Sequence, residues 1–292
     1  MLFFDLDGTL LAPGSTLTDR TRSALRGAIG GGARLALATG GFSYRALQLA
    51  RDIDDGRGAT WAITHNGAAT WDPAGRLVSV TTMPAESLRH VLSVTGPRVW
   101  CVYEELSGEH GTAVYYAGRH RHGLHHFVWG PQPPDVAPDT RKSLFPPSGR
   151  RRALRRGELD RVVGAWLIGT PEALRELDAS VEQDALLGAR YLHWSQRLGQ
   201  ILGNSRLRIV GRDIGPLGVS KGTAARALCE RLHVPPTATA AFGDADNDLE
   251  MLELAGTAVA MENATARVKE VATVIAPPNT EDGVAAILER WL

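Results

Sequence analysis

Short apolar runs alternate with amphipathic segments along the first 80 residues of the chain. The apolar runs are typical of buried strands and lie at Leu2–Leu6, Arg34–Ala38 and Thr60–Thr64. The intervening segments have helical periodicity and lie at Thr18–Ile29, where Thr18 is a suitable N-cap, and at Phe42–Ile53. This alternation predicts βαβ units whose parallel strands belong to one sheet.

The C-terminal part of the chain has the same alternation. It predicts helices at Val219–Leu232, Asp246–Leu254 and Glu281–Trp291. It also predicts strands at Ala238–Phe242, Thr257–Ala260 and Val271–Ile275. Because the two ends of the chain follow one pattern, we expect them to form a single sheet.

The middle of the chain has a different pattern. It predicts paired strands at Val99–Tyr103 and Thr112–Tyr115, further strands at Val162–Ile168, Tyr191–Trp194 and Leu207–Val210, and a helix at Pro171–Gln183. The segment Gly130–Gly149 holds six of the 16 prolines and is predicted to be a loop. The fold expected is therefore α/β: a doubly wound, parallel-sheet, Rossmann-like core of residues 1–81 and 213–292, with an inserted α+β domain at 82–212.

Composition narrows the class of protein. Of 292 residues, 43% are hydrophobic and 22% charged, as in an ordinary globular protein. Lys+Arg and Asp+Glu are equal at 32 each, so no net field attracts nucleic acid or an anionic membrane. Two cysteines exclude a disulfide framework and a Cys-rich zinc site. The chain begins in a strand and has no apolar stretch of membrane-spanning length, which leads us to expect a cytoplasmic protein.

Two acids at the C-terminal end of the first predicted strand suggest a metal site. Asp5 and Asp7 are separated by one residue, and residues i and i+2 of a regular strand share a face. Ligands of open α/β sheets bind beyond the carboxyl ends of strands, where these acids lie. Two close carboxylates repel, and Mg²⁺ relieves this while also binding substrate phosphate oxygens. The alternative is a solvated turn, in which Asp, Gly and Thr are common.

Three more groups lie at the ends of strands or the starts of helices. Thr39-Gly40 offers a hydroxyl and a backbone amide to phosphate oxygens, and Lys221, one of three lysines, adds positive charge at a helix N-terminus. Gly243–Asp248 contributes further carboxylates and the Asn247 amide. Individually these could be a turn, a solvated lysine and helix-capping acids. All four groups in this order indicate a phosphate site.

With these motifs the chain resembles the haloacid dehalogenase superfamily of phosphohydrolases, in particular its Cof-type members with a type IIB cap. The resemblance extends over nearly the whole chain. It is carried by FFDLDGTLL (Phe3–Leu11), LATG (Leu37–Gly40), THNGA (Thr64–Ala68), GVSKG (Gly218–Gly222), FGDADNDLEML (Phe242–Leu252), AVAMENA (Ala258–Ala264) and EDGVA (Glu281–Ala285).

The resemblance implies a role for each matching residue. Asp5 would be the nucleophile that becomes an aspartyl-phosphate, and Asp7 the general acid and base. The Asp5 carboxylate, the Asp7 backbone carbonyl and Asp244 would hold Mg²⁺, and Asp248 would support the metal. The residues implied in binding the phosphoryl group are Thr39, Gly40, Lys221 and Asn247.

The function expected is a Mg²⁺-dependent phosphatase acting on a small phosphorylated metabolite, such as a sugar phosphate, with the inserted domain setting specificity. Asp7 favours this activity, because ion-pumping ATPases of the superfamily carry Thr there. One alternative is a phosphomutase of the phosphomannomutase type, and another is a metabolite-binding regulator with vestigial activity. Relatives often have Arg where this chain has Gly41, so an arginine contact with substrate is missing or comes from elsewhere, with Arg45 as a candidate.

Two basic features of the inserted region carry no clear function. His120, His122, His125 and His126 lie near Arg119 and Arg121 without an accompanying acid or cysteine, so we interpret them as a polar surface. Arg150–Arg152, with Arg155 and Arg156, lacks interleaved aromatic residues and is interpreted as a solvated loop-and-helix face. The expected partner is thus a small metabolite, with neither nucleic acid nor membrane. Oligomeric state has no signature in the sequence.

Overall fold

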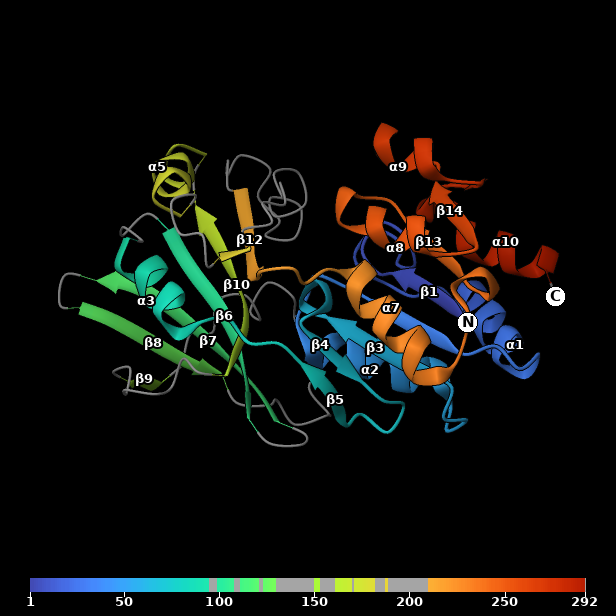
Figure 1. The fold of residues 1–292 in the computed structure, drawn as a ribbon, viewed down its shortest axis with the longest axis horizontal. Coiled ribbons are helices and arrows are strands. Elements are labelled where there is room, and N and C mark those ends of the chain that lie inside the picture. The colour runs from blue at the N-terminus through green and yellow to red at the C-terminus, as the bar shows by residue number, and fades with distance from the viewer. Residues whose placement is uncertain are drawn as a thin grey trace. The chain divides into compact units, whose positions relative to one another are not determined.

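The computed structural model describes residues 1–94, 99–107, 111–120, 123–129, 150–152, 161–169, 171–181, 187–188 and 210–291. The chain forms two compact units (Figure 1). We call residues Met1–Val80 with Val219–Leu292 the core unit, and residues Thr81–Gly218 the inserted unit. No helix within the described ranges is long and apolar enough to cross a membrane.

The core unit is built on an eight-stranded sheet of order β15-β14-β13-β1-β2-β3-β4-β5. Its strands are β1 (Leu2–Asp5), β2 (Leu35–Ala38), β3 (Thr60–Thr64), β4 (Ala69–Trp71), β5 (Leu77–Val80), β13 (Ala240–Gly243), β14 (Thr257–Met261) and β15 (Val274–Ala276). Neighbours from β15 to β3 are parallel, and β4 and β5 add an antiparallel hairpin. Residues from both ends of the sequence therefore form one sheet, as the pattern predicted.

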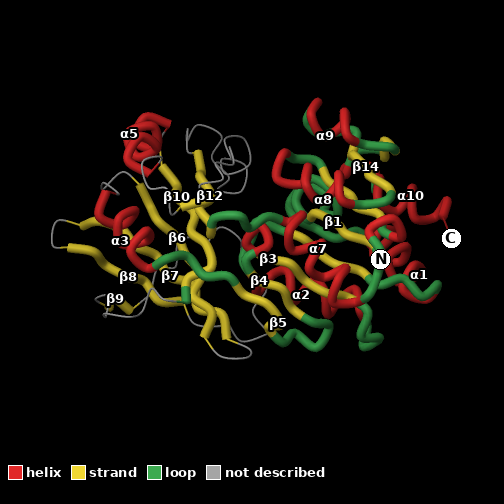
Figure 2. Tube along the Cα trace, in the orientation of Figure 1, coloured by secondary structure: helices red, strands yellow, loops and turns green. Residues whose placement is uncertain are grey.

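Helices flank this sheet (Figure 2). They are α1 (Asp19–Gly30), α2 (Ser43–Asp54), α7 (Lys221–Leu232), α8 (Leu249–Leu254), α9 (Ala266–Val271) and α10 (Gly283–Trp291), with short 3₁₀ turns η1 (His65–Gly67), η2 (Pro236–Ala238), η3 (Asp246–Asp248) and η4 (Asn279–Glu281). Helices α7, α8 and α9 pack on the sheet face that carries Phe3, Ala36 and Ile63. Helix α1 contacts α2 and α10. The predicted α/β fold class with a doubly wound, mostly parallel sheet is confirmed.

The central strands of the core unit are almost entirely buried, because helices cover both faces of the sheet there. All four residues of β2 and all five of β3 are buried. Continuous apolar runs, rather than alternating ones, are what such strands require. The Thr18 side chain accepts a hydrogen bond from the Thr21 backbone N–H and caps α1, in agreement with the predicted N-cap.

The inserted unit contains a seven-stranded antiparallel sheet of order β11-β12-β10-β6-β7-β8-β9. Its strands are β6 (Val99–Ser107), β7 (Gly111–His120), β8 (Gly123–Trp129), β9 (Arg150–Arg152), β10 (Val162–Gly169), β11 (Leu187–Gly188) and β12 (Val210–Pro216). Helices α3 (Ala85–Val94) and α5 (Pro171–Val181) pack on it through a separate apolar core, which includes Tyr103, Leu167 and Ile214. The predicted pairing of the strands near Val99 and Thr112 is confirmed by β6 and β7.

Several element predictions differ from the structure. Val271 ends helix α9, so the strand predicted at Val271–Ile275 begins only at Val274. The hairpin of β4 and β5 was not predicted, since its short strands lack a clear period. The predicted elements at Gly130–Gly149 and Tyr191–Trp194 lie outside the described residues, as do Arg155 and Arg156. The three consecutive arginines Arg150–Arg152 form strand β9, paired with β8, so the loop-and-helix face expected there is wrong for these residues.

Candidate active site

The carboxyl ends of three adjacent parallel strands define the site. Strand β1 lies between β13 and β2, with Phe4 paired to Phe242 and Asp5 paired to Ala38. The first residues beyond β2 and β13 are Thr39 and Asp244. Because the three strands run in the same direction, their ends meet at one edge, where α/β proteins bind ligands. The fold thus gathers Asp5, Thr39 and Asp244 from distant parts of the sequence.

Lys221 enters this edge from the N-terminus of α7. Ser220 caps the helix: its side chain accepts from the Thr223 backbone N–H, and the Thr223 hydroxyl accepts from the Ser220 backbone N–H. Lys221 is the first helical residue and is fully buried. Its Nζ donates to Asp5 Oδ1 at 2.5 Å and to Asp248 Oδ1 at 2.7 Å. The cap therefore sets the direction in which the lysine leaves the helix.

The ammonium group of Lys221 stays protonated despite its burial. Burial alone lowers the pKa of a lysine, but the nearby charges of Asp248 and Asp5 outweigh it, so the pKa of Lys221 lies above the ordinary value. The charge is thus fixed beside Asp5 throughout the neutral pH range.

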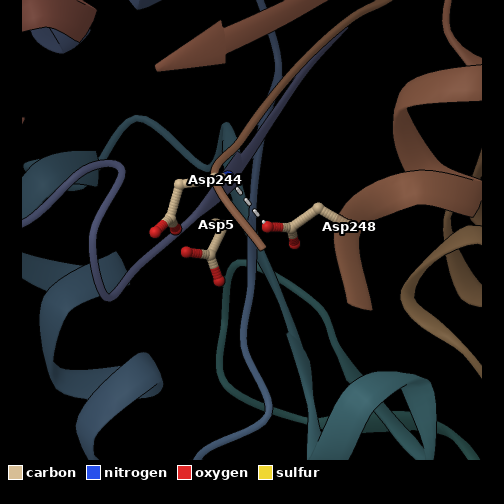
Figure 3. Close-up of side chains that lie close together, drawn as sticks. All are labelled: Asp5, Asp244 and Asp248. Carbon is tan, nitrogen blue, oxygen red and sulfur yellow. Dashed lines mark hydrogen bonds between the residues drawn. The ribbon is translucent and has the colours of Figure 1, made fainter. Parts of the chain in front are cut away.

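Three buried carboxylates, Asp5, Asp244 and Asp248, form a cluster (Figure 3). One oxygen from each lies within 4.8 Å of the others. Asp248 Oδ2 accepts from the backbone N–H groups of Asp244 and Ala245, at 3.0 and 3.1 Å. Thr9 Oγ1 donates to Asp244 Oδ1 at 3.1 Å. These bonds fix the carboxylates of Asp244 and Asp248 around Asp5.

This cluster is chemically suited to a divalent cation. Burial, and then the negative charge of Asp248, hold the pKa of Asp5 well above its usual range even though Lys221 opposes the shift. The Lys221 ammonium balances one of three negative charges, which leaves carboxylate charge for a metal. Hard oxygen ligands are those that Mg²⁺ prefers. The donor set therefore fits Mg²⁺, with Asp248 already engaged by Lys221 and two N–H groups.

Asp7 is not one of the three clustered carboxylates, so the face that it was expected to share with Asp5 does not extend to this cluster. Strand β1 ends at Asp5, and Gly8 takes a positive φ of 96°, so the period of two no longer applies at Asp7. Its carboxylate Oδ1 instead lies 3.7 Å from Arg45 Nη1 and 3.4 Å from the Ser15 hydroxyl, which donates to it. The side chains of Asp7 and Arg45 are 41% and 43% exposed. Arg45, considered from sequence as a substrate contact, is thus placed beside Asp7.

The predicted phosphate-binding residues lie in three segments, which are the loop after β2 (Thr39-Gly40), the start of α7 (Lys221) and η3 (Asn247). Asn66, which sequence reasoning did not select, contacts two of these segments through its side chain. The Thr39 hydroxyl accepts from the Gly41 backbone N–H at 2.9 Å and shapes the loop after β2. Asn247 Nδ2 donates to Asn66 Oδ1 at 2.9 Å, across 181 positions of sequence. A Cβ at Gly40 would lie 3.0 Å from the Asn66 amide atoms. In the sequence, Asn66 appeared only within the THNGA motif, and no role was assigned to it.

Asn263 is a second residue that the sequence did not single out. Its Nδ2 donates to the Gly8 carbonyl at 2.8 Å, and its Oδ1 accepts from the Asn279 backbone N–H at 3.0 Å. Asn279 Nδ2 in turn donates to the Leu11 carbonyl at 2.7 Å. These bonds tie the turn after β1, which carries Asp7, to the C-terminal part of the core unit.

Comparison with known proteins identifies the family. The family model for haloacid dehalogenase-like hydrolases matches residues 2–118 and 196–288. The chain is 28% identical over 302 residues to Phosphatase YwpJ of Bacillus subtilis (100% of this chain, 99% of the relative). It is 24% identical over 297 residues to 5-amino-6-(5-phospho-D-ribitylamino)uracil phosphatase YcsE of the same organism (100% and 95%).

The fold agrees with this family. It is similar to the crystal structure of a haloacid dehalogenase-like hydrolase from Bacteroides thetaiotaomicron, with a TM-score of 0.74, 21% identity, and coverage of 100% of this chain and 98% of that chain. The chain belongs to the haloacid dehalogenase-like hydrolase family and is a phosphatase of that family. The resemblance inferred from the motifs is therefore confirmed.

Proposed function

We propose that the protein is a Mg²⁺-dependent phosphatase that hydrolyses the phosphate monoester of a small metabolite through an aspartyl-phosphate at Asp5. The observation that carries this proposal is the position of Asp5, which lies at a strand end, contacts the Lys221 ammonium and is clustered with the carboxylates of Asp244 and Asp248. A nucleophile in such a site has both a fixed cation and metal-binding carboxylates beside it. Phosphoryl transfer depends mainly on positioning and charge neutralisation of this kind.

The first half-reaction forms a bond between a carboxylate oxygen of Asp5 and phosphorus while the bond from phosphorus to the ester oxygen breaks. The Asp7 carboxyl gives its proton to the departing alkoxide. In the second half-reaction, Asp7 takes a proton from water as the water oxygen attacks phosphorus. Inorganic phosphate and the Asp5 carboxylate are then released. The exposure of Asp7 suits this role, because both the leaving alcohol and the water must reach it.

The remaining site residues bind and orient the phosphoryl group and the metal ion. Lys221, the Thr39 hydroxyl, the Gly40 amide and the Asn247 amide would bind the phosphoryl oxygens. The Asp5 and Asp244 carboxylates and the Asp7 backbone carbonyl would hold Mg²⁺. Asp248 would support the site by holding the backbone of Asp244 and Ala245 in place. Bound Mg²⁺ neutralises the charge that develops on the phosphoryl group.

For the substrate, we propose a sugar phosphate or a related polyol phosphate ester. The ribitylamino phosphate named for YcsE is a molecule of this class, and YcsE matches this chain along its whole length. We propose that the inserted unit is the cap that selects among such substrates. No further substrate detail follows from the core residues, because the phosphoryl group is common to all candidates.

The test is phosphate release from p-nitrophenyl phosphate by wild type, Asp5→Asn and a control, Asp19→Asn. Asp19 is a fully solvated acid at the start of α1, with 99% of its side chain exposed. We expect wild type and Asp19→Asn to be equally active with Mg²⁺ and inactive in EDTA. Asp5→Asn should lose about 10⁴-fold or more in kcat, because the nucleophile is gone.

Two outcomes would contradict the proposal: an Asp5→Asn variant that keeps its activity, or wild-type turnover that is insensitive to EDTA. A phosphomutase is distinguished with sugar phosphates as substrates. Hydrolysis yields free phosphate, whereas a mutase yields an isomeric sugar phosphate and little free phosphate. A regulator with vestigial activity would release phosphate neither from p-nitrophenyl phosphate nor from sugar phosphates.

A further inference from the structure

The turn η1 after β3 has an unusual backbone. His65 and Asn66 have positive φ angles of 51° and 52°, and Gly67 has a φ of 109°. Two consecutive side-chain-bearing residues in the left-handed region are unfavourable, since only Gly and, to a lesser degree, Asn adopt it readily. His65 and Asn66 are also buried. Strain of this kind persists where the surrounding structure imposes it, and it often marks a functional site.

This turn contacts two of the predicted phosphate-binding segments through its backbone. The Asn66 backbone N–H donates to the Thr39 carbonyl at 3.0 Å. Gly67 lies against the start of α7 so closely that a Cβ there would be 2.1 Å from the Ser220 carbonyl oxygen. The turn therefore fixes the distance between the loop at Thr39 and the helix that carries Lys221.

The Asn66 side chain reaches the third segment. Its Oδ1 accepts from Asn247 Nδ2 at 2.9 Å, and its amide packs against the position of Gly40. Rotation of an asparagine amide about χ2 has a broad energy profile, so the Asn247 amide needs a hydrogen bond to hold one orientation. Asn66 supplies that bond from a rigid, buried turn.

We propose that Asn66 is a positioning residue for phosphoryl transfer, which holds Asn247 in the orientation that binds the phosphoryl group and fixes Asn247 relative to Thr39-Gly40 and Lys221. The inference rests on the proposed function, because Asn247 has this task only if the site transfers phosphoryl groups.

The test is a double-mutant cycle with Asn66→Gly, Asn247→Ala and the double variant, assayed on p-nitrophenyl phosphate with Mg²⁺. Glycine keeps the left-handed backbone and removes only the amide, so the melting temperature should stay within a few degrees of wild type. We expect kcat/KM of Asn66→Gly to fall about 10- to 100-fold, the usual effect of removing a group that orients a site residue. The double variant should lose no more than Asn247→Ala alone, because Asn66 acts through Asn247.

The matched control is His233→Gly. His233 is also left-handed, with a φ of 54°, but it is exposed at the end of α7. This variant should keep full activity, which separates relief of backbone strain from loss of the amide. Full activity in Asn66→Gly, or losses that multiply in the double variant, would overturn the inference while the active wild type upholds the proposed function. An inactive wild type would overturn both.

Discussion

Replacement of Lys221 by methionine tests the electrostatic basis of the site. Lys221 is fully buried, and its Nζ lies 2.5 Å from Asp5 and 2.7 Å from Asp248. Methionine has a similar length and no charge, so Asp5 and Asp248 would remain buried without this partner. Removing one member of a buried ion pair costs about 3–5 kcal/mol of unfolding free energy. That is a large part of the ~5–15 kcal/mol by which proteins are typically stable.

The loss of unfolding free energy in Lys221→Met should grow as pH rises. The pKa of Asp5 is already raised, by burial first and then by Asp248, and removal of Lys221 raises it further. A carboxyl whose pKa is higher in the folded state binds more protons there than in the unfolded chain. Stability therefore falls as pH rises from the unfolded value near 3.8 to the folded one. The Lys221→Met variant should thus approach wild-type stability near pH 4 and show its full loss at pH 8.

The assay is urea unfolding at pH 4 and pH 8, followed by tryptophan fluorescence. EDTA is present so that bound metal makes no contribution. Lys269→Met is the control: Lys269 is exposed on α9, and its replacement should change the unfolding free energy by less than about 0.5 kcal/mol. A loss for Lys221→Met below about 1 kcal/mol at pH 8, or a loss that is equal at the two pH values, would refute the reasoning.

Two further predictions concern the turns before and after β3. Asp54 accepts from the backbone N–H groups of Gly58, Ala59 and Thr60 at 2.6–2.7 Å; burial raises its pKa, but these bonds outweigh burial and lower it. Asp54→Asn should therefore lower the free energy of unfolding by about 1.5–3 kcal/mol at pH 7. Urea unfolding should show the difference between wild type and variant shrinking as pH falls below about 4. A urea midpoint at pH 7 that equals the wild-type midpoint would contradict this. Gly67→Ala should lower the free energy of unfolding by about 1–3 kcal/mol or more, since its Cβ would meet the Ser220 carbonyl. Gly32→Ala is the control, with a φ of 89° and open space around the new Cβ. In thermal melts of both variants, Gly32→Ala should lose clearly less stability than Gly67→Ala. Equal losses would refute the clash.

Much of the fold could be predicted from the chain alone. Strands buried on both faces must be continuously apolar, and runs such as Thr60–Thr64 coincide with the observed strand. The start of α1 was visible in Thr18, because a capping hydroxyl is a local feature. The motifs also identified the family, since acids after strands and a lysine at a helix start are unusual together. Features that depend on only a few neighbouring residues can thus be predicted from sequence.

The tertiary structure decided which of these groups meet. Asp5 and Lys221 are 216 positions apart, and their contact depends on β13 pairing beside β1. Asp7 shows the limit of periodicity most clearly: the alternation of side chains predicts a shared face only while a strand lasts, and β1 ends at Asp5. Asn66 gave no sign of its contact with Asn247, because a short motif such as THNGA does not say what its side chains touch 181 positions away. Local sequence set the chemistry and the elements, whereas long-range strand order and turn geometry set the distances on which that chemistry depends.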